Sequence, residues 1–561
     1  MRYYIFCGCT FEEEMSIQHC INTLISYLPG SHAVISPGSR NAPVVYALDH
    51  SSKQCHSIID ERSAAFVALG IAKATREPVI LSCTSGTAAI NYYPAIAEAY
   101  YARVPLIILT ADRPPEQIDA WDGQAIRQKG VYANHIRAEF QTPDSYEDIA
   151  TFRDIAARVE KCLATEISGP IHINISIREP FYEFTEEGLV TVPATHINIP
   201  QQNISVASIA AHLKEDFRQK KVLVFNGMEC DENIVIASDD GTVMLSDITS
   251  NLTSDVHYWD AMLFSAQSKS NGIDFLSVLS PDILITTGTT TISKGLKRFL
   301  QHHKPERHIH LTKHYEVGDM FKSNPQILNP EDITAVEEVD GDTDGERDGA
   351  YVNAWLNMTQ EFKSRFSALD WSEYTEFTAT NHILNNLPKK AVLHISNSMP
   401  VRYVSFLLNS DVSNNTVYAN RGTSGIDGST STAVGNALVT NEDIYLITGD
   451  VAFFYDINAL FNSRLPQNLK IIVLNNHSGG IFEMISGPDK MGDSMEYQTT
   501  PHTYDAEKLA EHFRVGYFKA DTIGKLAQGY DLLRASEGAY ILEVQTSKES
   551  NQAFFSQFKS L

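Results

Sequence analysis

Short apolar runs, each followed by a longer amphipathic or polar stretch, recur along the whole chain. Examples lie at 32–36, 78–83 and 105–110 in the first third and at 443–448 and 469–474 in the last third. Each run has the length of one strand and is mostly apolar, which is typical of parallel strands that are buried on both faces. The alternation of these runs with helical stretches predicts α/β sheets that are covered by helices on both sides.

The strand–helix pattern restarts twice, so we predict three doubly wound parallel-sheet α/β domains. Polar segments at 184–203 and 327–350 separate the three parts of the chain. The expected domains are 1–190, 200–350 and 370–561. The chain length of 561 residues agrees with this division, because domains commonly contain about 100–200 residues.

Composition and charge narrow the possible classes of function. The hydrophobic fraction of 43% excludes a largely disordered chain, and no uncharged apolar run reaches the ~18 residues of a membrane span. The formal net charge is −25, whereas nucleic-acid binding requires a basic surface. An anionic ligand therefore needs arginine and lysine side chains placed locally around it.

Cysteine usage indicates a reducing compartment. The chain contains 7 cysteines, and their spacing matches neither a disulfide framework nor a zinc ribbon. The first residues lack the long apolar core of a signal peptide. We therefore expect a cytoplasmic protein, and translation from Met1 or from Met15 stays open.

Three weaker patterns have ordinary explanations. The stretch 340–351 resembles half of a calcium loop, but Tyr351 stands where that loop needs a Glu, so the acidic segment 331–348 is interpreted as a solvated linker. The histidines within 308–314 have no well-spaced acid or cysteine and are interpreted as strand residues, not metal ligands. No G-x-G-x-x-G follows a predicted strand, which disfavours a nicotinamide enzyme.

Polar residues of the first domain stand just after predicted strands, where open α/β sheets bind their ligands. Arg40, Glu61 and Arg113 each occupy such a position, and a small loop with Gly86 and Thr87 follows another strand. A loop of this kind presents backbone N–H groups to an anion. Ordinary alternatives are helix capping for Glu61, a helix start for the loop, and surface ion pairs for the arginines.

The strongest local signal lies in the last third. Asp450 directly follows one predicted strand, and Asn475 and Asn476 follow the next. Two neighbouring strand ends therefore provide carboxylate and amide oxygens, which Mg²⁺ prefers when it binds a diphosphate. An ordinary turn is the alternative explanation.

Nine short motifs between 36 and 482 resemble, in the family's order, those of the thiamin-diphosphate-dependent 2-succinyl-5-enolpyruvyl-6-hydroxy-3-cyclohexene-1-carboxylate synthases of menaquinone biosynthesis. Some positions depart from the pattern of relatives: Ser478 stands where a glycine is common, and Gly295 follows Lys294 where relatives often have a second basic residue. Val451 replaces a glycine of the wider superfamily, which the synthase family also lacks. The motifs are SPGSRNAP, IDERSAAFVALG, SGTAAIN, TADRPPE, GQAIRQ, NSMPVR, NRGTSGIDG, GDVAFFYD and NNHSGGIF.

The resemblance implies thiamin diphosphate with Mg²⁺ or Mn²⁺, bound at the subunit interface of a homodimer or a dimer of dimers. Glu61 is then the catalytic residue: it bonds a pyrimidine nitrogen and favours the imino tautomer, and a buried carboxyl with a raised pKa suits this role. Ile426 is the implied wedge that bends the cofactor. The implied cofactor-binding residues are Glu61, Gly86, Thr87, Ser424, Ile426, Asp450, Asn476, Ile481 and Phe482, and the implied metal ligands are Asp450, Asn476 and the carbonyl of Ser478.

The reaction that the resemblance implies decarboxylates 2-oxoglutarate and adds the resulting four-carbon carbanion to isochorismate by 1,4-addition. Both substrates are dicarboxylates, and guanidinium groups recognise carboxylates through paired hydrogen bonds. The implied substrate-binding residues are Ser39, Arg40, Arg113, Gln124, Lys294, Ser398, Arg402 and Arg421.

Two other functions stay open at this point. Another thiamin-diphosphate 2-oxoacid decarboxylase or synthase would share Glu61, Asp450 and Asn476 but not the set of cationic residues. A non-catalytic nucleotide-binding protein on the same fold would have no need of Glu61.

Overall fold

The computed structural model describes most of the chain, and every structural statement below refers to the described residues. These are 16–146, 148–165, 167–192, 202–228, 234–237, 241–314, 317–333, 349–408, 415–462, 464–484 and 488–561. Met1, Met15 and the greater part of the acidic segment 331–348 therefore lie outside the described residues. The chain divides into two compact units, which are treated separately: unit 1 is Met1–His196 with Phe461–Ser463, and unit 2 is Ile197–Leu460 with Arg464–Leu561.

Unit 1 is built on one parallel sheet of six strands in the order β2-β1-β3-β4-β6-β5. The central strands β3, β4 and β6 are buried along their whole length, as their continuous apolar sequences require. The strands are β1 (His32–Ile35), β2 (Gln54–Ser57), β3 (Val79–Cys83), β4 (Leu106–Asp112), β5 (Ala138–Gln141) and β6 (Ile171–Ser176).

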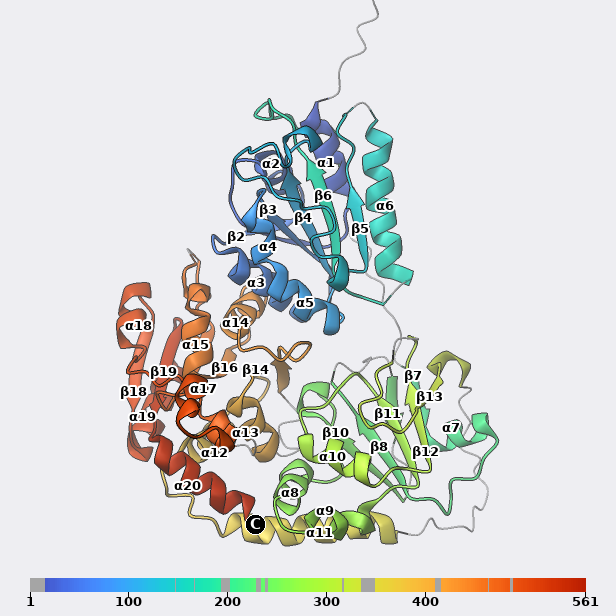
Figure 1. Ribbon diagram of the computed structural model, residues 1–561, viewed down its shortest axis with the longest axis vertical. Coiled ribbons are helices and arrows are strands. Elements are labelled where there is room, and N and C mark those ends of the chain that lie inside the picture. Colours follow the sequence, from blue (N-terminus) through green and yellow to red (C-terminus); the bar gives the residue numbers. More distant parts are fainter. Residues whose placement is uncertain are drawn as a thin grey trace, which may run out of the picture. The chain divides into compact units, whose positions relative to one another are not determined.

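Helices cover both faces of this sheet (Figure 1). The residues of α1, α2 and α6 join one face of the strands in a shared apolar core, while α3 contacts β1, β3 and β4. The helices are α1 (Ile17–Tyr27), α2 (Ala42–Asp49), α3 (Glu61–Thr75), α4 (Thr87–Asn91), α5 (Tyr93–Tyr101) and α6 (Ile149–Thr165).

The first half of unit 2 contains a five-stranded parallel sheet in the order β10-β8-β11-β12-β13 and a separate two-stranded pair, β7-β9. The strands are β7 (Gln202–Ser205), β8 (Val222–Asn226), β9 (Ile234–Ala237), β10 (Thr242–Ser246), β11 (Ile283–Thr287), β12 (Arg307–Leu311) and β13 (Gln326–Leu328). The helices are α7 (Val206–Leu213), α8 (Trp259–Ala266), α9 (Gly272–Phe275) and α10 (Lys294–His302).

The second half of unit 2 contains a six-stranded parallel sheet in the order β15-β14-β16-β17-β19-β18, the same arrangement as in unit 1. Its strands are β14 (Val392–Ile395), β15 (Thr416–Ala419), β16 (Ile444–Gly449), β17 (Leu469–Asn475), β18 (Gly516–Ala520) and β19 (Tyr540–Gln545). Its helices are α11 (Ala350–Ser367), α12 (Glu376–Asn385), α13 (Met399–Leu407), α14 (Ser429–Ala437), α15 (Asp450–Tyr455), α16 (Ile481–Met484), α17 (Met495–Thr499), α18 (Glu507–Phe513), α19 (Ile523–Ala535) and α20 (Lys548–Lys559).

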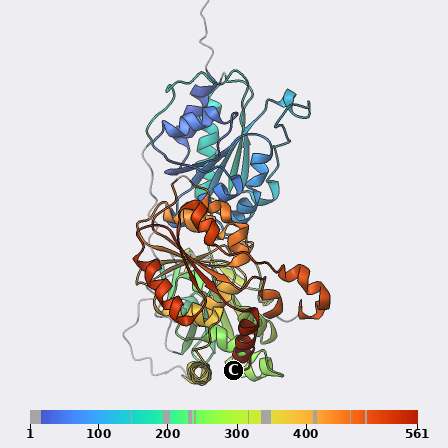
Figure 2. The same ribbon diagram turned by 90° about the vertical axis from the view of Figure 1, so that its left-hand side faces the viewer.

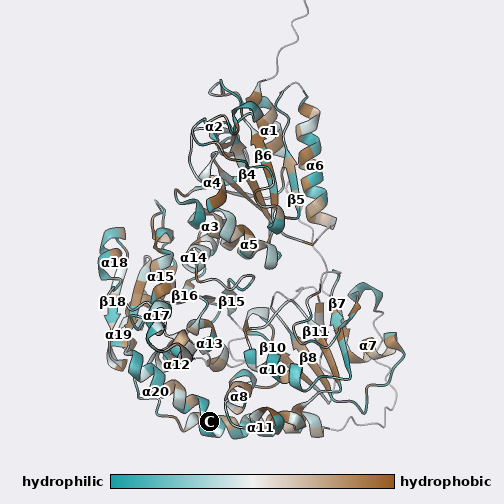
Figure 3. Ribbon diagram, in the orientation of Figure 1, coloured by the Kyte–Doolittle hydropathy of each residue, from teal (hydrophilic) through white to brown (hydrophobic). Residues whose placement is uncertain are grey.

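One apolar core joins the two halves of unit 2. It includes Trp259 and Leu263 of α8, Leu296 of α10 and Val404 of α13. The apolar residues concentrate on the sheets and on the helix faces turned toward them, as the colouring of Figure 3 shows. The turned view of Figure 2 shows the same flanking of each sheet by helices.

The predicted fold class, three doubly wound parallel-sheet α/β parts, is confirmed. The sequence also predicts a helix around 457–464, and this prediction is wrong: the structure has α15 at Asp450–Tyr455, followed by a short 3₁₀ turn at Ile457–Leu460. No helix among the described residues is long and apolar enough to cross a membrane. The domain boundaries predicted from the sequence stay a prediction.

Candidate active site

In unit 1, Glu61 begins α3 at the carboxyl end of β2, and the preceding residue caps the helix. The Asp60 side chain accepts a hydrogen bond from the Ser63 backbone N–H at 3.1 Å. The Glu61 carboxylate lies near Cys83 at the end of β3 and helps to raise the pKa of that thiol, after burial itself. Because Asp60 caps the helix, capping does not explain the carboxylate at Glu61.

The small loop before α4 packs closely against the segment that contains Gln124. Gly86 has a φ of +85°, and a Cβ atom there would lie 3.2 Å from the Gln124 carbonyl oxygen. The Gly86 N–H donates to the Gln128 side-chain oxygen at 2.9 Å. Gly86, Thr87 and Gln124, all predicted site residues, therefore gather at one end of the sheet.

The predicted arginines of unit 1 already have protein partners. Arg40 is buried and donates to the Ile177 carbonyl at 2.8 Å and to the Glu179 carboxylate at 3.0 Å. Arg113 donates to the Gly123 carbonyl at 2.6 Å. The two arginines are near enough that Arg113, after burial, lowers the pKa of Arg40. Ser39 shares a hydrogen bond of 2.7 Å with the Tyr182 hydroxyl.

A buried polar network that the sequence did not reveal supports these loops. Gln128 donates to the Ala111 carbonyl at 3.2 Å and to the Asn174 oxygen at 3.0 Å. Asn174 donates in turn to the Asp112 carboxylate at 2.7 Å. Gln128 is the last residue of the GQAIRQ motif, which is the only sequence signal that pointed to it.

In unit 2, Asp450 and Asn476 approach each other from the ends of β16 and β17. The Asp450 carboxylate accepts hydrogen bonds from the Val451 N–H at 2.7 Å and from the Ser478 N–H at 3.2 Å. The Asn475 amide is engaged elsewhere, with the Glu543 carboxylate at 2.6 Å. Asn476, not Asn475, is therefore the amide that is available beside Asp450.

The orientation of the Asn476 amide fits a metal ligand. Its nitrogen donates to the Glu376 carboxylate at 2.7 Å. Its oxygen is buried and has no hydrogen-bond partner among the described residues. A carboxylate, an amide oxygen and the Ser478 carbonyl are ligands that Mg²⁺ prefers. These residues thus fit a divalent cation on a diphosphate.

Glu376, the first residue of α12, was not predicted from the sequence. Its second oxygen accepts a hydrogen bond from the Tyr403 hydroxyl at 3.1 Å. Burial, followed by the nearby Asp450, raises the pKa of Glu376 to about 8. Because the Asn476 amide nitrogen donates to Glu376, the Asn476 amide oxygen points away from Glu376.

His502 is another neighbour that the sequence did not indicate. Its Nε2 lies 3.3 Å from the Asp450 carboxylate. Its backbone N–H donates to the His477 carbonyl at 3.0 Å, which links the segment before α18 to the loop after β17.

Three predicted cations gather near the N-terminus of α13. Burial and then Arg421 lower the pKa of Arg402 to about 10. Burial and then Arg402, with Arg421 among the further causes, lower the pKa of Lys294. Arg402 donates to the carbonyl of Ser398, which stands just before α13 with a φ of 79°. The lowered pKa values of Arg402 and Lys294 indicate a concentrated positive field, which an anionic ligand would relieve.

Hydrogen bonds of Asn397, just before α13, hold the loop that contains Arg421, Ser424 and Ile426. Asn397 donates to the carbonyls of Asn420 at 2.6 Å and Gly425 at 2.5 Å. Arg421 donates to the Asn397 oxygen at 2.9 Å.

The remaining predicted cofactor-binding residues lie near the loop that contains Asn476. Ile481 and Phe482 begin α16, just after the loop that contains Asn476, and Ile481 packs against the core of unit 2.

The histidines of β12 have structural partners. The rings of His308 and His310 both lie 2.8 Å from the Thr286 hydroxyl. His308 also lies 2.8 Å from the Ser323 hydroxyl.

Two family profiles match separate parts of the chain. The family profile "Thiamine pyrophosphate enzyme, N-terminal TPP binding domain" matches residues 20–141, and "Thiamine pyrophosphate enzyme, C-terminal TPP binding domain" matches residues 404–544.

Relatives match over nearly the whole chain. Proteins of Flavobacterium psychrophilum and Cytophaga hutchinsonii are each 36% identical, covering 94% of this chain and 96% and 95% of their own lengths. A protein of Bacteroides thetaiotaomicron is 32% identical and covers 92% of this chain and 93% of its own length. All three are named 2-succinyl-5-enolpyruvyl-6-hydroxy-3-cyclohexene-1-carboxylate synthase.

Proposed function

The chain belongs to the family of 2-succinyl-5-enolpyruvyl-6-hydroxy-3-cyclohexene-1-carboxylate synthases, and from this premise we propose how its residues divide the work. It is a thiamin-diphosphate-dependent transferase of menaquinone biosynthesis. It decarboxylates 2-oxoglutarate and adds the four-carbon unit to isochorismate. Thiamin diphosphate, when bound, supplies the carbon nucleophile and the electron sink for this chemistry.

Unit 1 binds and activates the pyrimidine end of the cofactor. Glu61 holds a proton against a pyrimidine nitrogen, and Gly86 and Thr87 line the ring. Asp60, and not Glu61, caps α3, which supports this role for Glu61.

Unit 2 binds the diphosphate end. Asp450, Asn476 and the Ser478 carbonyl hold Mg²⁺ or Mn²⁺ on the diphosphate, and the buried, unpartnered oxygen of Asn476 supports this assignment. Ile426 is the wedge against the bent cofactor, and Ser424, Ile481 and Phe482 contact it.

The substrate carboxylates are bound by the cations, with Lys294, Arg402 and Arg421 as the central group. A protein with a formal net charge of −25 needs such a local concentration to bind two dicarboxylates. Ser39, Arg40, Arg113, Gln124 and Ser398 complete the proposed substrate set. The cation group near α13 is the observation that favours this function over that of another thiamin-diphosphate decarboxylase.

We further propose a cytoplasmic homodimer, or a dimer of dimers, in which each cofactor joins unit 1 of one subunit and unit 2 of its partner.

The function is tested by supplying 2-oxoglutarate with and without isochorismate and following carbon dioxide and the adduct. We expect stoichiometric adduct only when both substrates are present. Release of carbon dioxide from 2-oxoglutarate with no adduct would instead assign a simple decarboxylase.

A further inference from the structure

Asp260 is a buried carboxylate between the two halves of unit 2, and the chemistry proposed above gives it no role. It lies in the first turn of α8 and is only 4% exposed. One carboxylate oxygen accepts a hydrogen bond from the Ser293 hydroxyl and the other from the Ser405 hydroxyl. Burying a carboxylate costs free energy unless hydrogen bonds offset it, so a carboxylate at this position calls for an explanation.

The two serines belong to the elements that hold two of the proposed substrate-binding cations. Ser293 is the N-cap of α10, where its hydroxyl oxygen accepts from the Leu296 N–H at 2.9 Å, and Lys294 is the next residue. Ser405 lies in α13 three residues after Arg402, which is about one helical turn. Asp260 therefore connects the start of α10 with the part of α13 that follows Arg402.

The charge of Asp260 also suits the cation group. Arg402 lowers the pKa of Lys294, so holding the two cations together costs electrostatic free energy. Neither forms an ion pair with a carboxylate in the part of the chain that the structure describes. The Asp260 carboxylate acts on Arg402 from further away and favours its charged form. It offsets part of the repulsion among the cations, while the guanidinium keeps its hydrogen bond to the Ser398 carbonyl.

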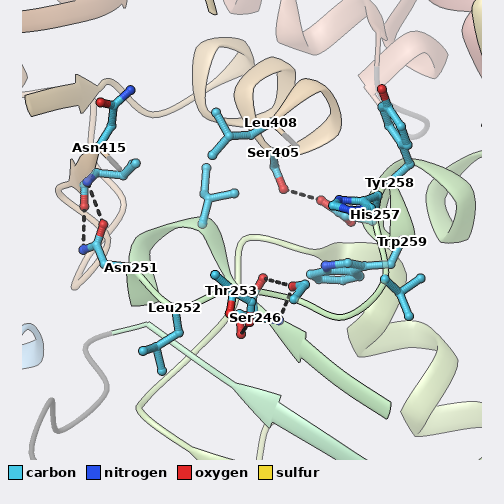
Figure 4. A pocket seen from close by; sticks show the side chains of 15 residues that line it. Ser246, Asn251, Leu252, Thr253, His257, Tyr258, Trp259, Ser405, Leu408 and Asn415 are labelled. Atoms are coloured by element: carbon cyan, nitrogen blue, oxygen red, sulfur yellow. Dashed lines mark hydrogen bonds between the residues drawn. The ribbon is translucent and has the colours of Figure 1, made fainter. Parts of the chain in front are cut away.

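A second link holds the neighbouring loop at the same junction. The Asn251 side chain accepts from the Val417 N–H at 2.7 Å and donates to the Val417 carbonyl at 3.2 Å. Val417 lies in β15, which leads into the loop with Arg421. Figure 4 shows Asn251 facing the segment of Asn415 and Ser405 directed toward the segment of Tyr258 and Trp259.

The cavity between these two links does not itself bind a substrate. Its volume is about 70 Å³, whereas pockets for small molecules measure about 300–1,000 Å³. We therefore interpret the polar groups around it as groups that hold the two halves of unit 2 together.

We propose that Asp260 is a positioning residue, which sets the spacing and the charge balance of Lys294 and Arg402 for a dicarboxylate substrate. This inference rests on the proposed function, because it takes both cations as substrate-binding residues.

The test compares Asp260→Ala and Ser405→Ala with wild type in two measurements. Steady-state kinetics give kcat and the KM values for 2-oxoglutarate and isochorismate, and calorimetry gives the Kd of glutarate, an unreactive dicarboxylate. We expect about a tenfold rise in one KM and in the glutarate Kd for Asp260→Ala, and a smaller rise for Ser405→Ala, with the Kd of thiamin diphosphate and Mg²⁺ unchanged. Combining Asp260→Ala with Lys294→Ala should add little to the effect of Lys294→Ala alone, because both act on one group.

The matched control is Asp255→Asn, because among the described residues the Asp255 carboxylate accepts a hydrogen bond only from the Met244 N–H, at 3.1 Å and within its own half of the unit. This variant should leave both KM values and the glutarate Kd as in wild type. A lowered Tm with unchanged KM values and an unchanged glutarate Kd in Asp260→Ala would assign a purely structural role and overturn the inference. If the wild-type enzyme forms no adduct, the proposed function is wrong. The glutarate Kd of Asp260→Ala still tests the positioning role of Asp260 in that case.

Discussion

The cationic side chains of the two units differ in the hydrogen-bond and carboxylate partners that the protein itself provides for them. In unit 1, Arg40 is bonded to Glu179 and Ile177, and Arg113 is bonded to the Gly123 carbonyl and lies 3.6 Å from the Asp122 carboxylate. In unit 2, Lys294 and Arg402 have no carboxylate partner among the described residues, and Arg402 lowers the pKa of Lys294.

The difference indicates a division of labour. Cations that are already paired hold loops in place and contribute less to binding a free anion. Cations that repel one another gain most from an arriving dicarboxylate. We therefore expect unit 2 to contribute most of the affinity for the substrates, and unit 1 to contribute the activation of the cofactor.

The largest expected effect belongs to unit 1. Glu61→Gln removes the acidic proton from the pyrimidine contact and should lower kcat by about 10²–10⁴-fold. The calorimetric affinity for Mg²⁺ with thiamin diphosphate should stay unchanged, because the proposed metal ligands lie in unit 2. Glu77→Gln, at a carboxylate that accepts a hydrogen bond from the Ser31 hydroxyl, is the control in the same unit. Turnover of Glu61→Gln within tenfold of wild type would refute the assigned activation role.

The next effect concerns the metal end of unit 2. Glu376→Met removes the acceptor that orients the Asn476 amide and should weaken Mg²⁺ binding by about 10–100-fold in calorimetry with thiamin diphosphate. Glu376→Gln keeps an oxygen acceptor and should stay near wild type. An unchanged Mg²⁺ affinity in Glu376→Met would show that Asn476 needs no such support.

A direct comparison of Arg402 with Arg40 tests the division of labour. Arg402→Met should raise the KM of one substrate by about 10–100-fold, the effect of losing a charged hydrogen bond of ~1.5–3 kcal/mol. Arg40→Met should raise either KM by less and should lower the Tm by a few degrees, because the buried Ile177 carbonyl loses the hydrogen bond from Arg40. Steady-state kinetics and calorimetric melting measure both, and equal KM effects would remove the distinction between the units.

The smallest effect is a pH dependence. The pKa of Lys294 is lowered from 10.5 by burial and by Arg402, so its charge is lost at a lower pH than that of an ordinary lysine. Because a charged ammonium binds the substrate, kcat/KM should fall as pH rises through this pKa. Lys294→Arg should move the fall to higher pH. A profile that is identical in both enzymes would exclude Lys294 from the substrate site.

The sequence revealed the buried strands and the residues at their ends, because both follow from local patterns. The apolar runs of β4 and β17 indicate central strands, and Asp450 and Asn476 follow such strands directly. The edge strands β5 and β18 mix polar and apolar residues, AEFQ and GYFKA, and gave no comparable signal.

The supporting residues could not be predicted in the same way. Glu376 meets Asn476 across 100 residues, and Asp260 meets Ser405 across 145. Each looks like an ordinary acid in the first turn of a helix. Only the packing of α12 against α13 and of α8 against α10 and α13 shows what these carboxylates contact.

The central claim is that Glu61 and Asp450 of different subunits complete one site, and subunit exchange tests it most directly. Glu61→Gln and Asp450→Asn proteins, each inactive alone, are mixed under conditions that allow their subunits to exchange. A mixed dimer then has one site with both residues intact, so activity should return to about a quarter of the wild-type value after random exchange. Activity that stays at the level of the separate variants, although mass spectrometry shows mixed dimers, would contradict the account.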